Sequence, residues 1–112
     1  MLVCVPVTTD GQVDPRWGRA ALVAIVDVRD GALVGWQESE VAWDRLHDEV
    51  PEGGHHARVA RFLLDNHVEV VVAHHMGGEM AHMLDRMGIR VNLGIEGDAR
   101  EAAIAAAGPS PV

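Results

Sequence analysis

The residues with the clearest capacity for chemistry are four of the seven histidines, which stand in two adjacent pairs near glycine pairs. His55 and His56 follow Gly53 and Gly54, while His74 and His75 are separated from Gly77 and Gly78 by Met76. Each pair lies where the chain is expected to enter a helix, and the first N–H groups of a helix attract anions. Neutral imidazole also binds zinc, copper, nickel and iron. The pairs therefore predict two walls of a binding crevice, with ordinary polar loop residues as the alternative.

A second set of candidate binding residues lies in the loop after the first predicted strand, where Arg16 and Arg19 flank Trp17. Guanidinium groups can neutralise an anionic thiometallate or a phosphate, and an indole can shield that anion from water. Because Pro15 and Gly18 bound this charged loop, we expect the indole at the mouth of the crevice, outside the main core. The alternative for the arginines is ion pairing with acidic residues at the surface.

Sulfur donors are few. Met76 lies in the loop beside the second histidine pair, where its soft thioether can cover a bound cluster. Met80, Met83 and Met87 recur at helical spacing and are expected to pack in the core. The single cysteine, Cys4, belongs to an apolar run and is expected to be inert inside a strand. The sequence contains no Cys-x-x-Cys or His-x-x-x-His spacing, so no particular metal is indicated.

Length and charge narrow the class of protein. The 112 residues fit one domain, predicted over residues 1–108, with 109–112 as a disordered tail. Seventeen acidic residues against nine basic ones, all arginine, give a net charge of −8, which argues against a nucleic-acid-binding surface. No apolar stretch approaches the roughly 20 residues of a membrane span. The sequence therefore predicts a soluble, cytoplasmic protein whose partner is a small ligand or another protein.

Hydrophobic periodicity predicts five strands and three helices. The expected strands are residues 2–7, 20–29, 32–43, 68–73 and 89–93, and the expected helices are 55–66, 79–87 and 99–107, the last capped by Asp98. Residues 44–54 are acidic and are expected to form a flexible connection. A hairpin followed by strand–helix–strand crossovers indicates an α/β fold with a mixed five-stranded sheet of order 3-2-1-4-5, in which strand two is antiparallel.

This topology places the candidate residues together. Ligands of such sheets bind at the carboxyl ends of the parallel strands, where the strand order reverses. Loops 8–19 and 74–78 share that edge, and the start of the helix at residue 55 can reach it. At helix starts we expect little core packing, so replacing either histidine pair by alanine should change the free energy of unfolding by no more than about 1 kcal/mol.

The whole chain resembles the dinitrogenase iron-molybdenum cofactor-binding family, which includes NifX-like carriers and the C-terminal domain of the cofactor-biosynthesis synthase. The matching segments are VPVTTDGQVDPRWGRA (5–20), AIVDV (24–28), GGHHARVA (53–60), VVVAHHMGG (70–78) and MGIRV (87–91). Two segments depart from the family pattern. Arg16 to Arg19 replace a common His-Phe-Gly-Arg, which removes one possible ligand, and His74 and His75 replace a glycine pair, which adds two.

The resemblance implies a ribonuclease-H-like α/β fold that holds a metal–sulfur cluster without catalysis. We therefore expect a carrier or accessory protein that binds an iron-molybdenum-type cluster or a single transition metal, with a cofactor-assembly protein as a possible partner. A regulatory or scaffolding module without metal is the alternative. A metal-dependent hydrolase is disfavoured, because Asp10 and Asp14 are typical turn residues and Asp27 lies on a hairpin strand.

Overall fold

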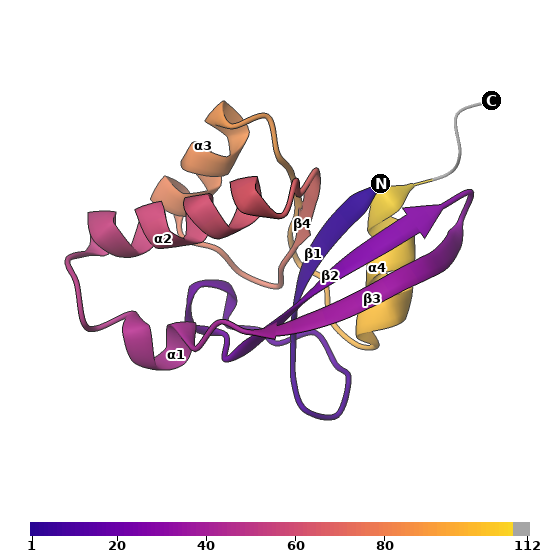
Figure 1. The fold of residues 1–112 in the computed structure, drawn as a ribbon, viewed down its shortest axis with the longest axis horizontal. Coiled ribbons are helices and arrows are strands. Elements are labelled where there is room, and N and C mark those ends of the chain that lie inside the picture. The colour runs from indigo at the N-terminus through magenta and orange to yellow at the C-terminus, as the bar shows by residue number, and fades with distance from the viewer. Residues whose placement is uncertain (109–112) are drawn as a thin grey trace.

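The computed structural model describes residues 1–108, so the expected tail at 109–112 lies outside the described residues (Figure 1). In chain order the elements are β1 (Leu2–Val7), the short 3-10 helix η1 (Trp17–Arg19), β2 (Leu22–Arg29), β3 (Ala32–Glu40), α1 (Trp43–Leu46), α2 (Glu52–Asp65), β4 (Val70–Val72), α3 (Gly78–Arg86), β5 (Arg90–Asn92) and α4 (Ala99–Ala107). Residues 8–16 form the first loop, which leads directly into η1.

The strands form one mixed sheet in the order β3-β2-β1-β4-β5. β2 is antiparallel to both β1 and β3, while β4 is parallel to β1 and β5. The predicted order and the antiparallel second strand are therefore confirmed. All residues of β1 after Leu2 are buried, because helices cover both faces of this central strand.

Two hydrophobic layers lie on opposite faces of the sheet. On one face, the alanines of α4 pack against valines of β1, β2 and β4. On the other face, Leu63 of α2 and Leu84 of α3 join Trp17 and Trp43 in a second core. Figure 1 shows α4 separated by the sheet from α2 and α3. The second layer holds Trp17, Trp43 and Phe62, whereas Trp36 packs against the first layer.

The expected start of α4 and the expected end of α3 agree with the structure. The carboxylate of Asp98 accepts hydrogen bonds from the backbone N–H groups of Arg100 and Glu101 at 2.8 and 3.0 Å, which confirms the predicted cap of α4. Gly88 follows α3 with a φ of +77°, a backbone conformation that favours glycine. Within the described part of the chain, every helix is too short or too polar to cross a membrane.

The connection between β3 and α2 differs from the prediction. β3 ends at Glu40 and not at residue 43, and Trp43 instead begins α1, a fourth helix that the sequence analysis missed. The Trp43 side chain is 1% exposed and packs edge-on against Trp17 and Phe62, so tertiary contacts draw this segment into the core. α2 begins at Glu52, which places Gly53 and Gly54 inside its first turn and not in a loop.

Cys4 lies on the β1 face that meets α2 and α3, and it is fully buried. Burial strongly raises the pKa of its thiol, so the sulfur stays protonated. The expectation that Cys4 is buried inside a strand is confirmed.

Candidate functional site

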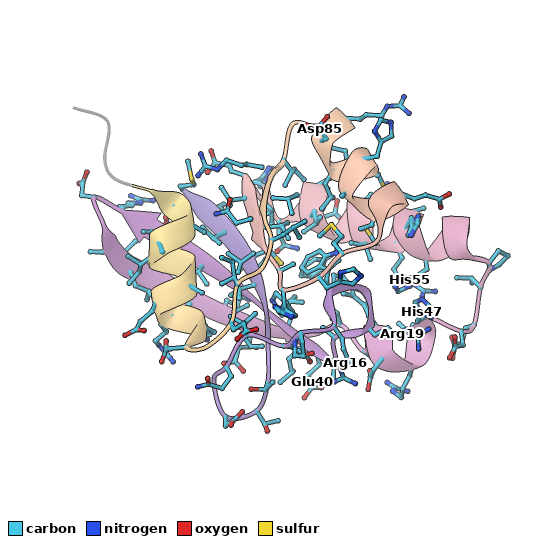
Figure 2. The ribbon with its side chains drawn as sticks, turned by 180° about the vertical axis from the view of Figure 1, so that it is seen from behind. Arg16, Arg19, Glu40, His47, His55 and Asp85 are labelled. Carbon is cyan, nitrogen blue, oxygen red and sulfur yellow. The ribbon has the colours of Figure 1, made fainter. Side chains whose placement is uncertain are left out.

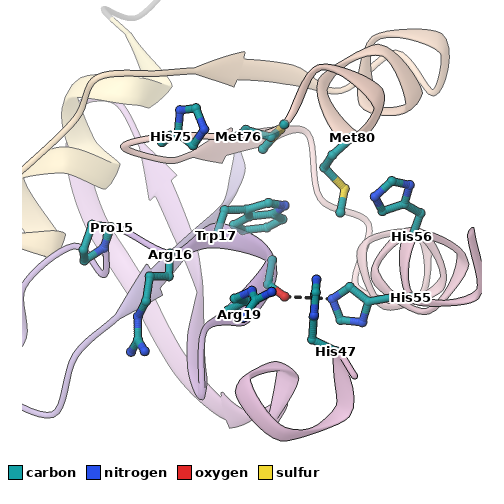
Figure 3. A pocket seen from close by; sticks show the side chains of 12 residues that line it. Pro15, Arg16, Trp17, Arg19, His47, His55, His56, His75, Met76 and Met80 are labelled. Carbon is teal, nitrogen blue, oxygen red and sulfur yellow. Dashed lines mark hydrogen bonds between the residues drawn. The ribbon is translucent and has the colours of Figure 1, made fainter. Parts of the chain in front are cut away.

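A pocket of about 300 Å³ opens between the first loop with η1, the start of α2 and the segment before α3 (Figure 3). Figure 2 shows Arg19, His47 and His55 close together at this end of the molecule. The lining residues come from four separate parts of the sequence: Pro15, Arg16, Trp17, Gly18, Arg19, His47, His55, His56, His75, Met76, Gly77 and Met80. The first loop and both histidine segments therefore meet at one pocket, as predicted.

Eight of the twelve predicted site residues line this pocket: Arg16, Trp17, Arg19, His55, His56, His75, Met76 and Gly77. The other four, Gly53, Gly54, His74 and Gly78, are not among its lining residues. A side chain added at Gly53, Gly77 or Gly78 would meet no atom within 4 Å, so no close approach requires glycine there. At Gly54 an added carbon would lie 3.3 Å from the Val50 side chain, a tight contact with the connection before α2 and not with the pocket.

The two histidines of the second pair diverge. His75 is exposed and lines the pocket, and its backbone forms a bridge to Arg16 in the first loop. His74 lies in a different cavity beside Val13 and Ile95, with its Nδ1 3.6 Å from a Glu96 carboxylate oxygen. The chain bends at His74, after the end of β4, and the two side chains line different cavities. His74 and His75 therefore do not face one site together.

His55 is a buried structural residue. Its side chain is 2% exposed, and its Nε2–H donates to the Gly18 carbonyl oxygen at 2.7 Å. Its Nδ1 accepts a longer contact from Arg58 Nη1 at 3.5 Å, so both ring nitrogens have partners. Burial lowers the pKa of His55, although the hydrogen bond to Gly18 opposes this shift. The expectation of little core packing at this helix start is wrong for His55, which ties α2 to η1.

Trp17 is also placed differently from the prediction. The indole is 2% exposed and belongs to the second core, with its ring centroid 5.4 Å from that of Trp43 in an edge-to-face arrangement. The expectation of an indole at the pocket mouth, outside the main core, is wrong, because α1 supplies an aromatic partner that draws the ring inward. Trp17 forms part of the inner wall of the pocket, between Met76 and Arg19 in Figure 3.

The two arginines at the pocket differ in their surroundings. Arg16 forms an ion pair with the buried Asp14, with Nε 3.2 Å from Oδ1, and this hydrogen bond raises the pKa of Arg16. The same Asp14 oxygen accepts the Arg16 backbone N–H at 2.9 Å, which shapes the loop. The Arg19 side chain is exposed, and its charge adds to the hydrogen bond from His47 in lowering the pKa of Asp48. Arg19 is thus the more available cation.

The sequence analysis missed His47 and Met80 as pocket residues. His47 follows α1, and its ring packs 4.9 Å from that of His55, so it could be placed only after α1 was known. Met80 was expected in the core and is indeed 4% exposed, but it also lines the pocket. Its position four residues after Met76 in the sequence was a usable signal.

The donor set does not suit a bare metal ion. Among the described residues, no group of three or more His, Cys, Asp or Glu side chains is arranged to hold one. Figure 3 shows His56 and His75 on opposite sides of Trp17. What the pocket offers is a mixture of imidazole, thioether and indole surfaces, with guanidinium groups near its rim. Such a lining suits a ligand that brings its own metal-bound anionic atoms.

These features define a small α/β protein with one aromatic, histidine- and methionine-lined pocket at the edge of a mixed sheet. The chain matches the model of the family described as dinitrogenase iron-molybdenum cofactor over residues 1–108, and it belongs to that family. A comparison with curated proteins gives no match.

Known structures share this fold. The crystal structure of PH0822 has a TM-score of 0.73 at 21% identity, covering 94% of this chain and 89% of that one. The apo orange protein of Desulfovibrio gigas has a TM-score of 0.72 at 24% identity, covering 90% and 82%. The Thermotoga protein TM1290, described as a DUF35 family member, has a TM-score of 0.65 at 25% identity, also covering 90% and 82%.

Proposed function

We propose that this protein is a small carrier that binds a preassembled metal–sulfur cluster of the iron-molybdenum type and does not itself catalyse a reaction. The observation that carries the proposal is the pocket, in which soft side chains line the interior and arginines lie at the rim. Membership of the iron-molybdenum cofactor family supports this class of ligand. The partner would be a protein that assembles or receives the cluster.

The donor set favours a cluster that arrives with its own sulfide ligands. Iron–sulfur clusters built on a protein require several cysteine thiolates, whereas the only cysteine here is buried and protonated. A preassembled cluster needs only charge neutralisation, one or two supplementary ligands and shielding from water. Such a cluster is the cargo of this protein and not a resident cofactor.

The pocket residues divide into three roles under this proposal. Arg19, with Arg16 beside it, attracts the anionic cluster. His56 and His75 are the imidazoles that contact its metals, while His55 holds the first loop in place through Gly18. Met76 and Met80, buried at 7% and 4% exposure, provide an apolar and polarisable surface.

The test is an anaerobic titration of the purified, untagged protein with tetrathiomolybdate, a soluble anionic probe for metal-bound sulfide. Binding should be saturable with one anion per chain, measured by calorimetry and by molybdenum content after gel filtration. Absence of saturable binding would contradict the carrier function and favour a protein-interaction module.

Substitutions in and outside the pocket test whether tetrathiomolybdate binds there. Arg19→Ala should weaken binding about 5- to 10-fold through the loss of one partly solvated charge contact. Arg61→Ala is the matched control, because Arg61 is an exposed arginine of α2 outside the pocket, paired with Asp65. His56→Ala and His75→Ala should weaken tetrathiomolybdate binding less than Arg19→Ala does, because the molybdenum of this probe already carries four sulfides and takes up no imidazole ligand. Equal affinities of the Arg19 and Arg61 variants would place the anion elsewhere.

A further inference from the structure

The indole nitrogen of Trp17 is a buried hydrogen-bond donor without an acceptor. Among the described residues, Trp17 Nε1 and His74 Nδ1 are the buried side-chain nitrogens that have no hydrogen-bond partner. The buried N–H of a tryptophan usually finds an acceptor, because an unmet donor is costly in an apolar environment. The His74 nitrogen lies 3.6 Å from a Glu96 carboxylate oxygen, and no ionic contact of this kind is available to the neutral indole of Trp17.

The position of this N–H relates it to the pocket. Trp17 lines the pocket, and Figure 3 shows the nitrogen-bearing edge of its ring turned toward the side of the pocket that holds Met80 and His56. The rest of the ring is held by Trp43, so the N–H direction is set before any ligand arrives. A fixed, unpartnered donor directed into a ligand pocket is a preorganised recognition element.

We infer that Trp17 Nε1–H donates a hydrogen bond to an anionic sulfur atom of the bound ligand and thereby selects thiometallates over oxyanions. This inference rests on the proposed carrier function and deepens it. Met76 and Met80 supply thioether surface beside the indole and contribute no hydrogen-bond donor, so the remaining donors of the pocket are its imidazole and guanidinium groups. A small, strongly hydrated oxyanion would exchange its water there for fewer hydrogen bonds, because the methionines replace none of them.

Sulfide-bearing anions are larger and softer than oxyanions. They are therefore less strongly hydrated, and they lose less hydration free energy on entering an apolar and polarisable site. Hydrogen bonds to cluster sulfurs are one means by which proteins set the reduction potentials of such clusters. The indole nitrogen is covered in the present conformation, and the unbranched methionine side chains beside it are flexible enough to let a ligand reach it. The anion therefore supplies the unpartnered nitrogen with a directed N–H to sulfur bond.

Nuclear magnetic resonance of the nitrogen-15-labelled protein tests this directly. The three tryptophans give three indole N–H signals, which Trp17→Phe, Trp36→Phe and Trp43→Phe assign. Addition of tetrathiomolybdate should move the Trp17 proton signal downfield, with a saturation curve that matches the calorimetric Kd. Trp36 is the internal control, because its Nε1 already donates to Glu38 at 2.9 Å, and its signal should not move.

Affinity provides the second readout. Trp17→Phe should weaken tetrathiomolybdate binding by about 10- to 100-fold, the range expected for loss of a hydrogen bond to a charged group, and Trp36→Phe should leave binding unchanged. Molybdate should bind at least 10-fold more weakly than tetrathiomolybdate to the unaltered protein, and this difference should shrink in Trp17→Phe.

The outcomes separate this inference from the carrier proposal. Saturable tetrathiomolybdate binding with an unmoved Trp17 signal would overturn the role of the indole and leave the carrier function intact. Molybdate binding as tight as tetrathiomolybdate would overturn the preference for sulfur. Absence of binding by either anion would contradict both. Because the signal shift is measured on the unaltered protein, a poorly folded Trp17→Phe variant would not prevent a decision.

Discussion

Replacing His55 by alanine should destabilise the protein well beyond the effect of an ordinary helix-surface substitution. The imidazole joins α2 to η1 through its 2.7 Å hydrogen bond to the Gly18 carbonyl. It also packs edge-on against His47 and Trp43, with ring centroids 4.9 and 6.4 Å away. His55→Ala removes the hydrogen bond and the packing together.

The magnitude follows from these two losses. A partly buried carbonyl left without its donor costs about 1–2 kcal/mol. The space left by a ring that is only 2% exposed costs about 1–2 kcal/mol more, because the surrounding aromatic residues relax only in part. We therefore expect a loss of about 2–4 kcal/mol in the free energy of unfolding. For a chain of this size, that loss lowers Tm by about 8–16 °C.

Calorimetry and urea unfolding measure this effect. The matched control is His75→Ala, which removes an exposed imidazole from the same pocket and should change stability by no more than about 0.5 kcal/mol. His55→Gln should recover part of the loss, because its amide N–H can reach the Gly18 carbonyl. If His55→Ala and His75→Ala have the same Tm, the link between α2 and η1 contributes nothing and the reasoning is refuted.

Three further predictions concern the pH dependence due to His55, the α4 cap and the reactivity of Cys4. Because burial lowers the pKa of folded His55 below its ordinary 6.5, its contribution to stability is full above pH 6.5 and falls as the pH drops through the interval down to the folded pKa. The loss of unfolding free energy between pH 7.5 and pH 5.5 should be smaller in His55→Gln, and an unchanged loss would contradict this. Asp98→Ala should cost about 1 kcal/mol in urea unfolding through loss of the α4 cap, with Asp98→Asn largely neutral as control. Cys4 should resist a thiol-labelling reagent in the native protein and react fully in guanidinium chloride, and rapid native labelling would contradict its burial.

Sheet topology and the start of α4 were accessible from the sequence because their signals are local. The two expected strands at 20–29 and 32–43 are separated by only two residues, which predicts the hairpin that places β2 beside β3. Asp98 predicts the start of α4 because capping involves only the next three residues. In each case neighbours in the chain carry the information.

The site could be predicted only in part. The three predicted segments converge as expected, because the carboxyl ends of the parallel strands meet at one sheet edge, while the fourth contributor, His47, was missed. The roles of individual residues within it could not be deduced, since adjacent histidines such as His74 and His75 look alike in a sequence. Only the course of the backbone separates them onto opposite sides.

By itself, then, the sequence determined the order of the strands, the central position of β1 and which loops form the pocket. The tertiary structure alone decided which side chains are buried there. Trp17 and His55 became core residues because Trp43, 26 and 12 positions away in the printed sequence, supplies the aromatic surface on which they pack. Burial depends on partners that are distant in the chain, and periodicity within one segment does not record them.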